Sequence, residues 1–192
     1  APRPAMECAA LRGVDFTGIP EAPAFILSAE TVPASGGTEA YCAVKGYVQP
    51  QIQFELRLPT HTWNGRYLQT GCGGFCGNIP INSCNDALAR NFAVAANNMG
   101  HVSGQEGLWA SVPELRRDYG ARSTHVVALA AKAILARFYG RAPDHAYFRG
   151  CSTGGREGLQ NAIRYPGDFD GIIAGDPAFP GRQGAIANNW IA

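Results

Sequence analysis

The residues that could carry chemistry centre on one serine. Residues 150–154 read GCSTG, which fits the pattern G-x-S-x-G. The segment follows a strand expected at 146–148 and precedes a helix that includes 158–165. A sharp turn between strand and helix, with glycine two residues to either side, lifts a serine hydroxyl clear of the sheet edge. The helix start beside it offers free N–H groups. The motif therefore predicts Ser152 as a nucleophile in acyl transfer.

Two alternatives stay open at this motif. A serine in this position also serves as a plain N-cap of the following helix. Cys151 carries a nucleophilic group as well, but its side chain is expected to point toward the sheet rather than out of the turn. Ser152 is favoured because the strand–turn–helix context is the one that the motif requires.

A Gly-rich segment is the second feature. Residues 71–77 read GCGGFCG and follow a short strand expected at 66–70. Acyl transfer needs N–H donors for the negative oxygen of its intermediate; one comes from the residue after the nucleophile, Thr153, and another from a loop after an earlier strand. A nucleotide-binding loop is disfavoured because Cys76 replaces the third glycine of G-x-G-x-x-G, and no Gly-Lys-Ser/Thr follows. The segment indicates an oxyanion loop, with a structural turn as the alternative.

The elements that must position these residues follow from hydrophobic periodicity. Alternation predicts strands at 44–48 and 52–58, and compact apolar runs predict strands at 91–96 and 170–174. Apolar residues recurring at three- and four-residue intervals predict a helix from about 123 to 140. Strands that alternate with helices imply an α/β fold, with a mainly parallel sheet and helices on both faces.

Composition and charge exclude several classes of protein. The chain has 192 residues, of which 46% are hydrophobic and 16% charged, and its formal net charge is +1. This balance argues against nucleic-acid binding, and no apolar run approaches the roughly 20 residues of a membrane helix. The first residues lack the pattern of a signal peptide, so a secreted protein would be represented by its mature form. Residues 1–41 are expected to form an irregular N-terminal arm, and 42–192 one domain.

The cysteines indicate an oxidising compartment. Six cysteines stand beside only two methionines, which favours a secreted or periplasmic protein. The sequence alone does not choose among the pairings that six thiols allow. The spacing of Cys72, Cys76 and Cys84 matches no usual structural zinc pattern. Disulfides, or a mixture of disulfides and a free thiol, are favoured over a metal site.

A family resemblance emerges from these segments. Residues 150–158 read GCSTGGREG and resemble the nucleophile signature of the tannase/feruloyl esterase family, which includes mono(hydroxyethyl) terephthalate hydrolase-like enzymes. Supporting segments stand in the expected order: WNGR at 63–66, RFYG at 137–140 and FDGIIAG at 169–175. The resemblance covers most of 42–176. It implies an α/β-hydrolase fold and an enzyme that hydrolyses carboxylic esters of phenolic or aromatic acids.

The resemblance also implies roles for particular residues. Ser152 would form the acyl-enzyme, and the N–H groups of Gly74 and Thr153 would form the oxyanion hole. Cys8 and Cys42 match a family disulfide near the N-terminus. A further pair between Cys76 and Cys84 is expected, which would leave Cys72 free.

The catalytic acid and base are the main departure from the family. In the family, an acid and a histidine follow the serine, beyond an inserted lid. Here no histidine follows Ser152, and the four histidines, at 61, 101, 125 and 145, all precede it. His101 follows a strand end and could line the site, but the partner order of the fold runs serine, acid, histidine. Asp176 ends a strand without a following histidine to orient.

The chain is therefore expected to be the N-terminal part of such an enzyme, without lid and C-terminal part, and to have little turnover alone. Polypeptide beyond this chain would supply the Asp and His, and Cys151 is the candidate for a disulfide to that segment. No metal or other cofactor is expected in this chain, and the resemblance would place calcium in the missing lid. The expected partner is a small aromatic ester, such as a gallate, ferulate or terephthalate ester, with no nucleic acid and no membrane. The alternative is a non-catalytic binding or interaction domain on the same frame.

Overall fold

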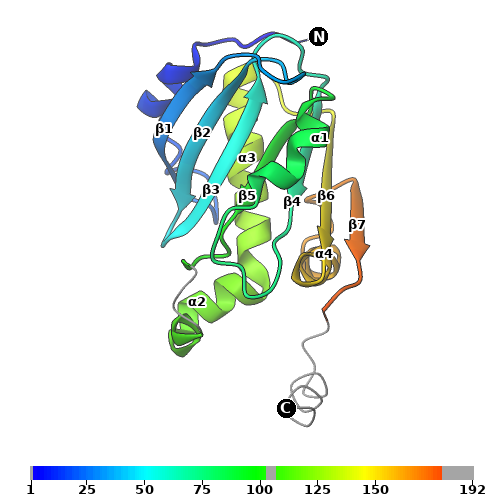
Figure 1. The fold of residues 1–192 in the computed structure, drawn as a ribbon. Coiled ribbons are helices and arrows are strands. Elements are labelled where there is room, and N and C mark those ends of the chain that lie inside the picture. Colours follow the sequence, from blue (N-terminus) through cyan, green and yellow to red (C-terminus); the bar gives the residue numbers. More distant parts are fainter. Residues whose placement is uncertain (1, 103–106, 179–192) are drawn as a thin grey trace.

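The computed structural model describes residues 2–102 and 107–178 of the chain. A seven-stranded sheet with the order β1-β2-β3-β5-β4-β6-β7 forms its centre (Figure 1). The strands are β1 (Ala24–Val32), β2 (Tyr41–Val48), β3 (Ile52–Pro59), β4 (Arg66–Thr70), β5 (Ala93–Asn97), β6 (His145–Cys151) and β7 (Gly171–Gly175). The α-helices are α1 (Asn85–Leu88), α2 (Pro113–Arg117), α3 (Ser123–Tyr139) and α4 (Thr153–Arg164). Shorter 3-10 turns lie at Cys8–Gly13, Ile81–Cys84 and Leu108–Ser111, and a π-helical turn at Asp118–Arg122 joins α2 to α3.

The sheet has an antiparallel half and a parallel half. The ladders β1–β2, β2–β3 and β3–β5 are antiparallel. The ladders β5–β4, β4–β6 and β6–β7 are parallel, so the expected parallel arrangement holds for the half that carries the serine motif. The antiparallel half differs because β2 and β3 are joined by a tight turn, which is too short for the crossover that parallel strands require.

The expectation of an irregular N-terminal arm is wrong. Within residues 2–41, β1 forms a nine-residue strand that pairs with β2, with Thr31 opposite Cys42. Leu11 and Phe16 from the same segment are buried in the main core. The boundary expected at 41/42 therefore falls inside a β-ladder. The Pro and Gly residues that suggested irregular structure flank β1 rather than interrupt it.

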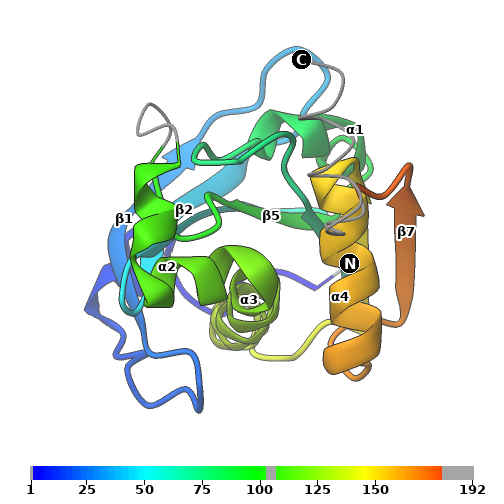
Figure 2. The same cartoon turned by 90° about the horizontal axis from the view of Figure 1, so that it is seen from below.

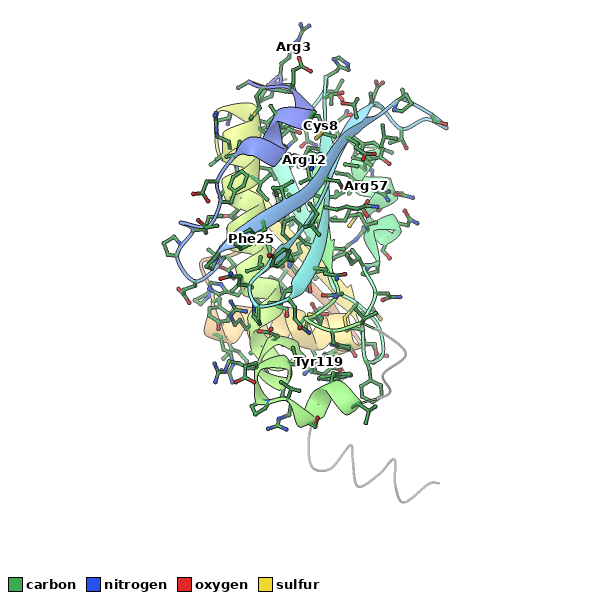
Figure 3. All side chains as sticks on the ribbon, turned by 90° about the vertical axis from the view of Figure 1, so that its left-hand side faces the viewer. Arg3, Cys8, Arg12, Phe25, Arg57 and Tyr119 are labelled. Atoms are coloured by element: carbon green, nitrogen blue, oxygen red, sulfur yellow. A yellow bond between two sulfur atoms is a disulfide. The ribbon has the colours of Figure 1, made fainter. Side chains whose placement is uncertain are left out.

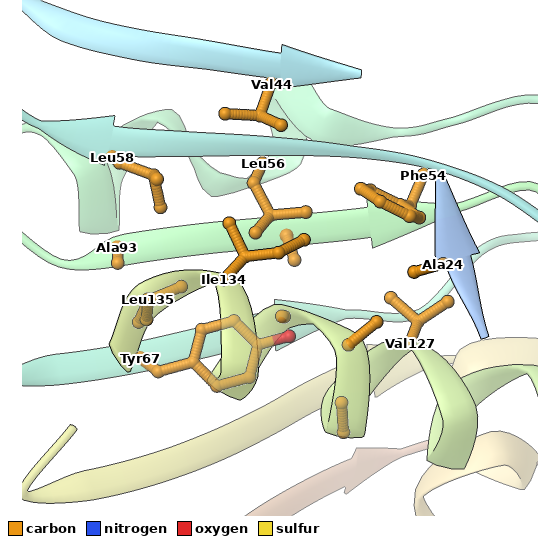
Figure 4. Close-up of a cluster of buried hydrophobic side chains, with 14 of the residues drawn as sticks. Ala24, Val44, Phe54, Leu56, Leu58, Tyr67, Ala93, Val127, Ile134 and Leu135 are labelled. Atoms are coloured by element: carbon orange, nitrogen blue, oxygen red, sulfur yellow. The ribbon is translucent and has the colours of Figure 1, made fainter. Parts of the chain in front are cut away.

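Helices cover both faces of the sheet, as the sequence predicts. Figure 2 shows α3 and α4 on one face and α1 on the other. Val127, Ile134 and Leu135 of α3 pack with the sheet residues Leu56 and Leu58 in the main core (Figure 4). Helix α3 ends at a Gly140 with φ of +71°, a left-handed position that glycine adopts without steric cost. In the described ranges, no helix is both long and apolar enough to cross a bilayer.

The parallel half brings the chemically interesting segments to one end of the sheet. The carboxyl ends of β4 and β6 lie side by side, with Thr70 opposite Arg149, and β7 ends beside β6, with Gly175 opposite Cys151. The Gly-rich segment follows β4 and the serine turn follows β6 at this end. Figure 3 shows Tyr119 at the end of the molecule opposite Arg3 and Cys8. Ligands of open α/β sheets bind at the carboxyl ends of the strands, so this is the end to search for a site.

Candidate active site

Ser152 lies exposed at the tip of a sharp turn between β6 and α4. Its backbone has φ of +58° and ψ of −118°, an unusual conformation for a residue with a side chain. Its N–H donates to the Gly175 carbonyl at 3.0 Å, and its carbonyl accepts from the N–H of Ala178 at 2.9 Å. These bonds fix the turn from both sides. The predicted strand–turn–helix context of Ser152 is confirmed.

The glycines of the motif are required by close packing. A Cβ on Gly150 would overlap the backbone of Gly154, and one on Gly155 would overlap the Gly175 carbonyl. A Cβ on Gly154 would lie 3.1 Å from the Cys72 carbonyl oxygen. Residue types without a side chain therefore allow α4 to start directly against the sheet and the Gly-rich segment.

The plain N-cap interpretation of Ser152 does not fit this geometry. The Ser152 side chain makes no capping hydrogen bond to α4. Thr153 is the first residue of α4, and the N–H groups of a first helical turn have no acceptor within the helix. The hydroxyl and the adjacent amide are thus both left available to a third group at the exposed end of the turn.

The structure brings the Gly-rich loop, residues 71–77, to the serine turn. Its first N–H, that of Gly71, donates to the Arg149 carbonyl of β6 at 2.9 Å. Further along the loop, the Thr153 hydroxyl donates to the Gly74 carbonyl oxygen at 2.6 Å. Gly74 is exposed, has φ of +58°, and its N–H has no acceptor among the described residues. The two residues predicted as oxyanion donors, Gly74 and Thr153, are therefore in direct contact.

Glu157 is a buried acid that the sequence analysis missed. Its Oε1 accepts from the Cys72 N–H at 3.0 Å, and its Oε2 accepts from the Thr124 hydroxyl at 2.8 Å. Burial raises the pKa of Glu157 to about 7, although both hydrogen bonds lower that pKa. The residue joins the Gly-rich loop to α3 and α4. Its position four residues after Thr153 places it on the same face of the helix, which was the available signal.

His101 faces the Gly-rich loop rather than Ser152. The ring is buried, and its Nε2 donates to the Phe75 carbonyl oxygen at 2.7 Å. It stacks on Trp109 with ring centroids 4.1 Å apart. A carbonyl oxygen only accepts hydrogen bonds, so the Nε2 atom carries a proton and cannot take one from a serine. The other ring nitrogen, Nδ1, lies 3.4 Å from the Met99 carbonyl oxygen, so both ring nitrogens face backbone carbonyls rather than Ser152, and His101 supports the loop.

The other titratable candidates lie in separate surroundings. His125 Nδ1 is 2.8 Å from the carboxylate of Asp168, and both side chains are buried. Asp170 accepts from the Ala146 N–H at 2.8 Å, and Asp176 is exposed. Across residues 2–102 and 107–178, no histidine or acidic side chain hydrogen-bonds to Ser152. The described residues thus provide a serine and amide donors without an acid–base pair.

One predicted disulfide is confirmed and one is wrong. Cys8 and Cys42 are bonded, with Cα atoms 5.5 Å apart. The second disulfide joins Cys72 to Cys76, not Cys76 to Cys84. The reason is that the 3-10 turn at 81–84 directs Cys84 into a second hydrophobic core, where burial raises its pKa to about 12. The same bond uses two of the three thiols of the zinc alternative.

Cys151 is the other free cysteine, and it is exposed. It lines a pocket of about 460 Å³ together with Cys72, Gly73 and Gly150. Its thiol is therefore accessible to solvent. The thiol lies beside the serine turn, on the side of β7.

Known structures identify the class of this fold. An esterase from Aspergillus oryzae superposes with a TM-score of 0.79 at 28% identity, covering 90% of this chain and 37% of that one. Feruloyl esterase B from Aspergillus oryzae gives a TM-score of 0.76 at 27% identity. The sheet, the strained serine turn and these neighbours confirm an α/β-hydrolase fold.

The family follows from the sequence. Residues 37–192 match the family described as tannase and feruloyl esterase, so the chain belongs to that family. Mono(2-hydroxyethyl) terephthalate hydrolase of Piscinibacter sakaiensis is 37% identical over 176 residues, covering 84% of this chain and 29% of that protein. Probable feruloyl esterase B-1 of Aspergillus terreus is 39% identical over 139 residues, covering 72% and 26%. The chain thus spans less than a third of the length of these two relatives.

Proposed function

We propose that this chain carries the nucleophile and oxyanion hole of a serine-dependent carboxylic ester hydrolase that acts on esters of phenolic or aromatic acids. The observation that carries the proposal is the exposed Ser152 on a strained turn, whose neighbour Thr153 contacts the Gly74 loop. Family membership supports ester hydrolysis. The names of the relatives, a terephthalate ester hydrolase and a feruloyl esterase, support an aromatic acid as the acyl group.

The chemistry follows the serine hydrolase scheme. Ser152 Oγ attacks the ester carbonyl carbon while its proton passes to a histidine base. The negative oxygen of the tetrahedral intermediate accepts hydrogen bonds from the N–H groups of Gly74 and Thr153. The bond to the alcohol oxygen then breaks, and the alcohol leaves with the proton that the histidine returns. Water attacks the acyl-enzyme with the same base and releases the acid and free Ser152.

The acid and the histidine come, in this proposal, from polypeptide beyond this chain. Three observations support a further segment packed at β7. The two relatives are more than three times longer than the aligned part. Ile173 on β7 is 70% exposed, and a pocket of about 520 Å³ lined by Leu68, Tyr147 and Ile172 lies beside it. The exposed Cys151 is the candidate for a disulfide to that segment.

The proposed location is outside the cytoplasm. Two disulfides join four of the six cysteines. Such bonds form and persist in oxidising compartments. They favour a secreted or periplasmic enzyme, and a mass spectrum of the native protein with and without reductant would test them.

The decisive experiment is Ser152→Ala in the complete polypeptide that contains this chain. Turnover of methyl ferulate, methyl gallate or short p-nitrophenyl esters should fall by at least about 10³-fold, and fluorophosphonate labelling should disappear. Ser35→Ala, in an exposed turn remote from the serine motif, is the matched control and should keep full activity. Turnover and labelling that survive in Ser152→Ala would contradict the proposal. Ligand binding without turnover in the unchanged protein would support a binding domain instead.

The isolated chain gives a second test. We expect little or no turnover from residues 1–192 alone, because a serine without its base keeps only a small part of the rate enhancement. Near-normal turnover would contradict the proposal that the acid–base pair lies outside the chain.

A further inference from the structure

Three side chains hold the backbone carbonyls at the centre of the Gly-rich loop. The Thr153 hydroxyl donates to the Gly74 carbonyl oxygen at 2.6 Å, and the Tyr119 hydroxyl donates to the same oxygen at 3.3 Å. His101 Nε2 donates to the next carbonyl oxygen, that of Phe75, at 2.7 Å. We call Thr153, Tyr119 and His101 the carbonyl latch. They come from α4, the π-helical turn and the loop after β5, three segments that are separate in sequence.

Two of the latch residues, Tyr119 and His101, are held in place by further side chains. The Arg156 guanidinium lies 4.4 Å from the centre of the Tyr119 ring, and it donates to the Tyr119 carbonyl at 3.2 Å. Trp109 stacks on His101 with centroids 4.1 Å apart and contacts the Tyr119 ring at 4.8 Å. Stacking and cation–π contacts of this kind limit the rotamers of both donors. The latch therefore presents its hydroxyl and N–H groups in fixed directions.

A loop of this composition needs such support. Glycines have more accessible backbone conformations than other residues, so Gly73 and Gly74 lose the most freedom when the loop is ordered. An oxyanion donor accelerates a reaction only when it is preorganised toward the developing charge. Among the described residues, the Gly74 N–H makes no hydrogen bond, so the peptide that carries it is restrained through the neighbouring Gly74 and Phe75 carbonyls.

We propose that the carbonyl latch is the positioning device of the oxyanion hole, with the Thr153 hydroxyl as its main member. This inference rests on the proposed function. Thr153 then acts twice: its N–H is one donor to the oxyanion, and its side chain holds the Gly74 carbonyl, in the peptide next to the one that carries the Gly74 N–H.

The first experiment uses two variants of the complete polypeptide. Thr153→Val keeps the N–H and removes the hydroxyl, whereas Thr153→Ser keeps both. Loss of an oxyanion donor costs about 10²–10³-fold in kcat, so loosening one should lower kcat by about 10- to 100-fold. KM should change by less than about threefold, because the hole binds charge that develops in the transition state. Thr153→Ser should recover most of the lost kcat.

Thr60→Val is the matched control for this pair. The Thr60 hydroxyl also donates to a backbone carbonyl, that of Ala40 at 2.9 Å, at the other end of the sheet. Its loss should lower stability by a similar amount and leave kcat unchanged. His101→Gln and His101→Leu form a second pair, because a Gln amide can still donate to Phe75 and Leu cannot. We expect kcat to fall only with Leu.

A readout without catalysis separates this inference from the proposed function. In the 192-residue chain, the backbone N–H of Cys76 donates to the Gly73 carbonyl oxygen at 3.0 Å, and the backbone N–H of Gly77 donates to the Asn98 carbonyl oxygen at 3.2 Å. Thr153→Val should increase hydrogen exchange of these two amides by about tenfold, and Thr153→Ser should not. Unchanged exchange, or a kcat of Thr153→Val within about twofold of the parent, overturns the latch. Full turnover in Ser152→Ala overturns the proposed function, while the exchange data still decide whether the latch orders the loop.

Discussion

Two regions of the molecule are each built around a buried histidine. In the first, which we call the His101 region, the ring stacks on Trp109 and donates to the backbone of the Gly-rich loop. In the second, the His125 region, the ring stacks on Tyr165 at 3.7 Å and bonds to the Asp168 carboxylate at 2.8 Å. By residue type alone, the second is closer to a catalytic pair.

The difference lies in what each histidine holds. Around His125 the partners are side chains of α4 and of the segment before β7, including Asn161, which donates to Asp168 at 3.0 Å. Around His101 the partners are backbone carbonyls of an exposed loop beside the free end of α4. The comparison teaches that the side chains around the His101 ring hold the backbone of a loop next to Ser152, whereas those around His125 hold one another. A His–Asp pair in the core stabilises the fold without reaching the serine.

The largest loss of stability that we expect comes from a substitution at the serine turn, where the backbone is tightly packed. A Cβ on Gly150 would overlap main-chain atoms of Gly154, which cannot move aside as a flexible side chain can. Gly150→Ala should therefore lower the free energy of unfolding by about 4 kcal/mol or more, or prevent soluble expression. Gly13→Ala, with open space around the new methyl group, should change it by less than about 1 kcal/mol. Urea unfolding compares the two, and equal stabilities would show that the turn tolerates side chains.

The next largest effect falls in the His125 region. Asp168→Ala leaves His125 and the Asn161 amide without their buried acceptor, which should lower the free energy of unfolding by about 2–4 kcal/mol. Turnover per folded molecule of the complete polypeptide should stay within about twofold. Asp15→Ala removes an exposed carboxylate bonded to Thr17 and serves as the control. A large loss of kcat in Asp168→Ala would place the His125 region in catalysis and end the contrast.

The sequence predicts the features that are formed by residues close together in the chain. The strand at 66–70 and the helix at 123–140 follow from apolar periodicity. The Ser152 turn follows from the glycines at 150 and 154, whose spacing is typical of a sharp turn between a strand and a helix. These features are local, because the residues that form them are neighbours in the chain. The resemblance added Gly74 and the Cys8–Cys42 bond, and the bond is confirmed. Gly74 lies in contact with Thr153, and the donor roles of both residues stay predictions.

The features that the sequence did not predict are long-range. Strand β1 is recognised only when β2 pairs with it, and the predicted Cys76–Cys84 pair fails because Cys84 packs in the second hydrophobic core. Glu157 bonds to a residue 85 positions earlier in the chain, and Tyr119 reaches a loop 45 positions away. No local pattern encodes such contacts. His101 and His125 could not be told apart from the sequence for the same reason, because only their contact partners in the fold distinguish their roles.

The stability of the protein should depend on pH through Glu157, the buried acid that contacts the Gly-rich loop. Burial raises the pKa of Glu157 from its ordinary 4.5 to about 7. Between these values the folded state binds a proton that the unfolded state does not, so the free energy of unfolding falls as pH rises and levels off above 7. The fall is roughly 3 kcal/mol in total. Urea unfolding at pH 5, 6, 7 and 8 measures it.

Glu157→Gln is the control for this prediction. A Gln side chain can accept from the Cys72 N–H and donate to the Thr124 hydroxyl, so both buried contacts keep a partner. It does not titrate, and its unfolding free energy should lose this component of the pH dependence. Other acids, such as Asp118, whose pKa burial also raises, contribute equally to both proteins. Parallel pH curves for the parent protein and the Glu157→Gln variant would show that Glu157 does not titrate in this range.

The smallest expected effect compares the two stacked rings directly. His125 and Tyr165 are nearly parallel, at 4° between ring planes, and a stack of this kind contributes about 0.5–1.5 kcal/mol beyond its buried area. Tyr165→Leu should therefore lower the free energy of unfolding by about 1 kcal/mol and leave kcat unchanged. Trp109→Leu removes the ring that stacks on His101. In this variant kcat should fall as well, because the His101 ring holds the Phe75 carbonyl. If both variants of the complete polypeptide lose kcat in proportion to stability, the two regions do not differ in function.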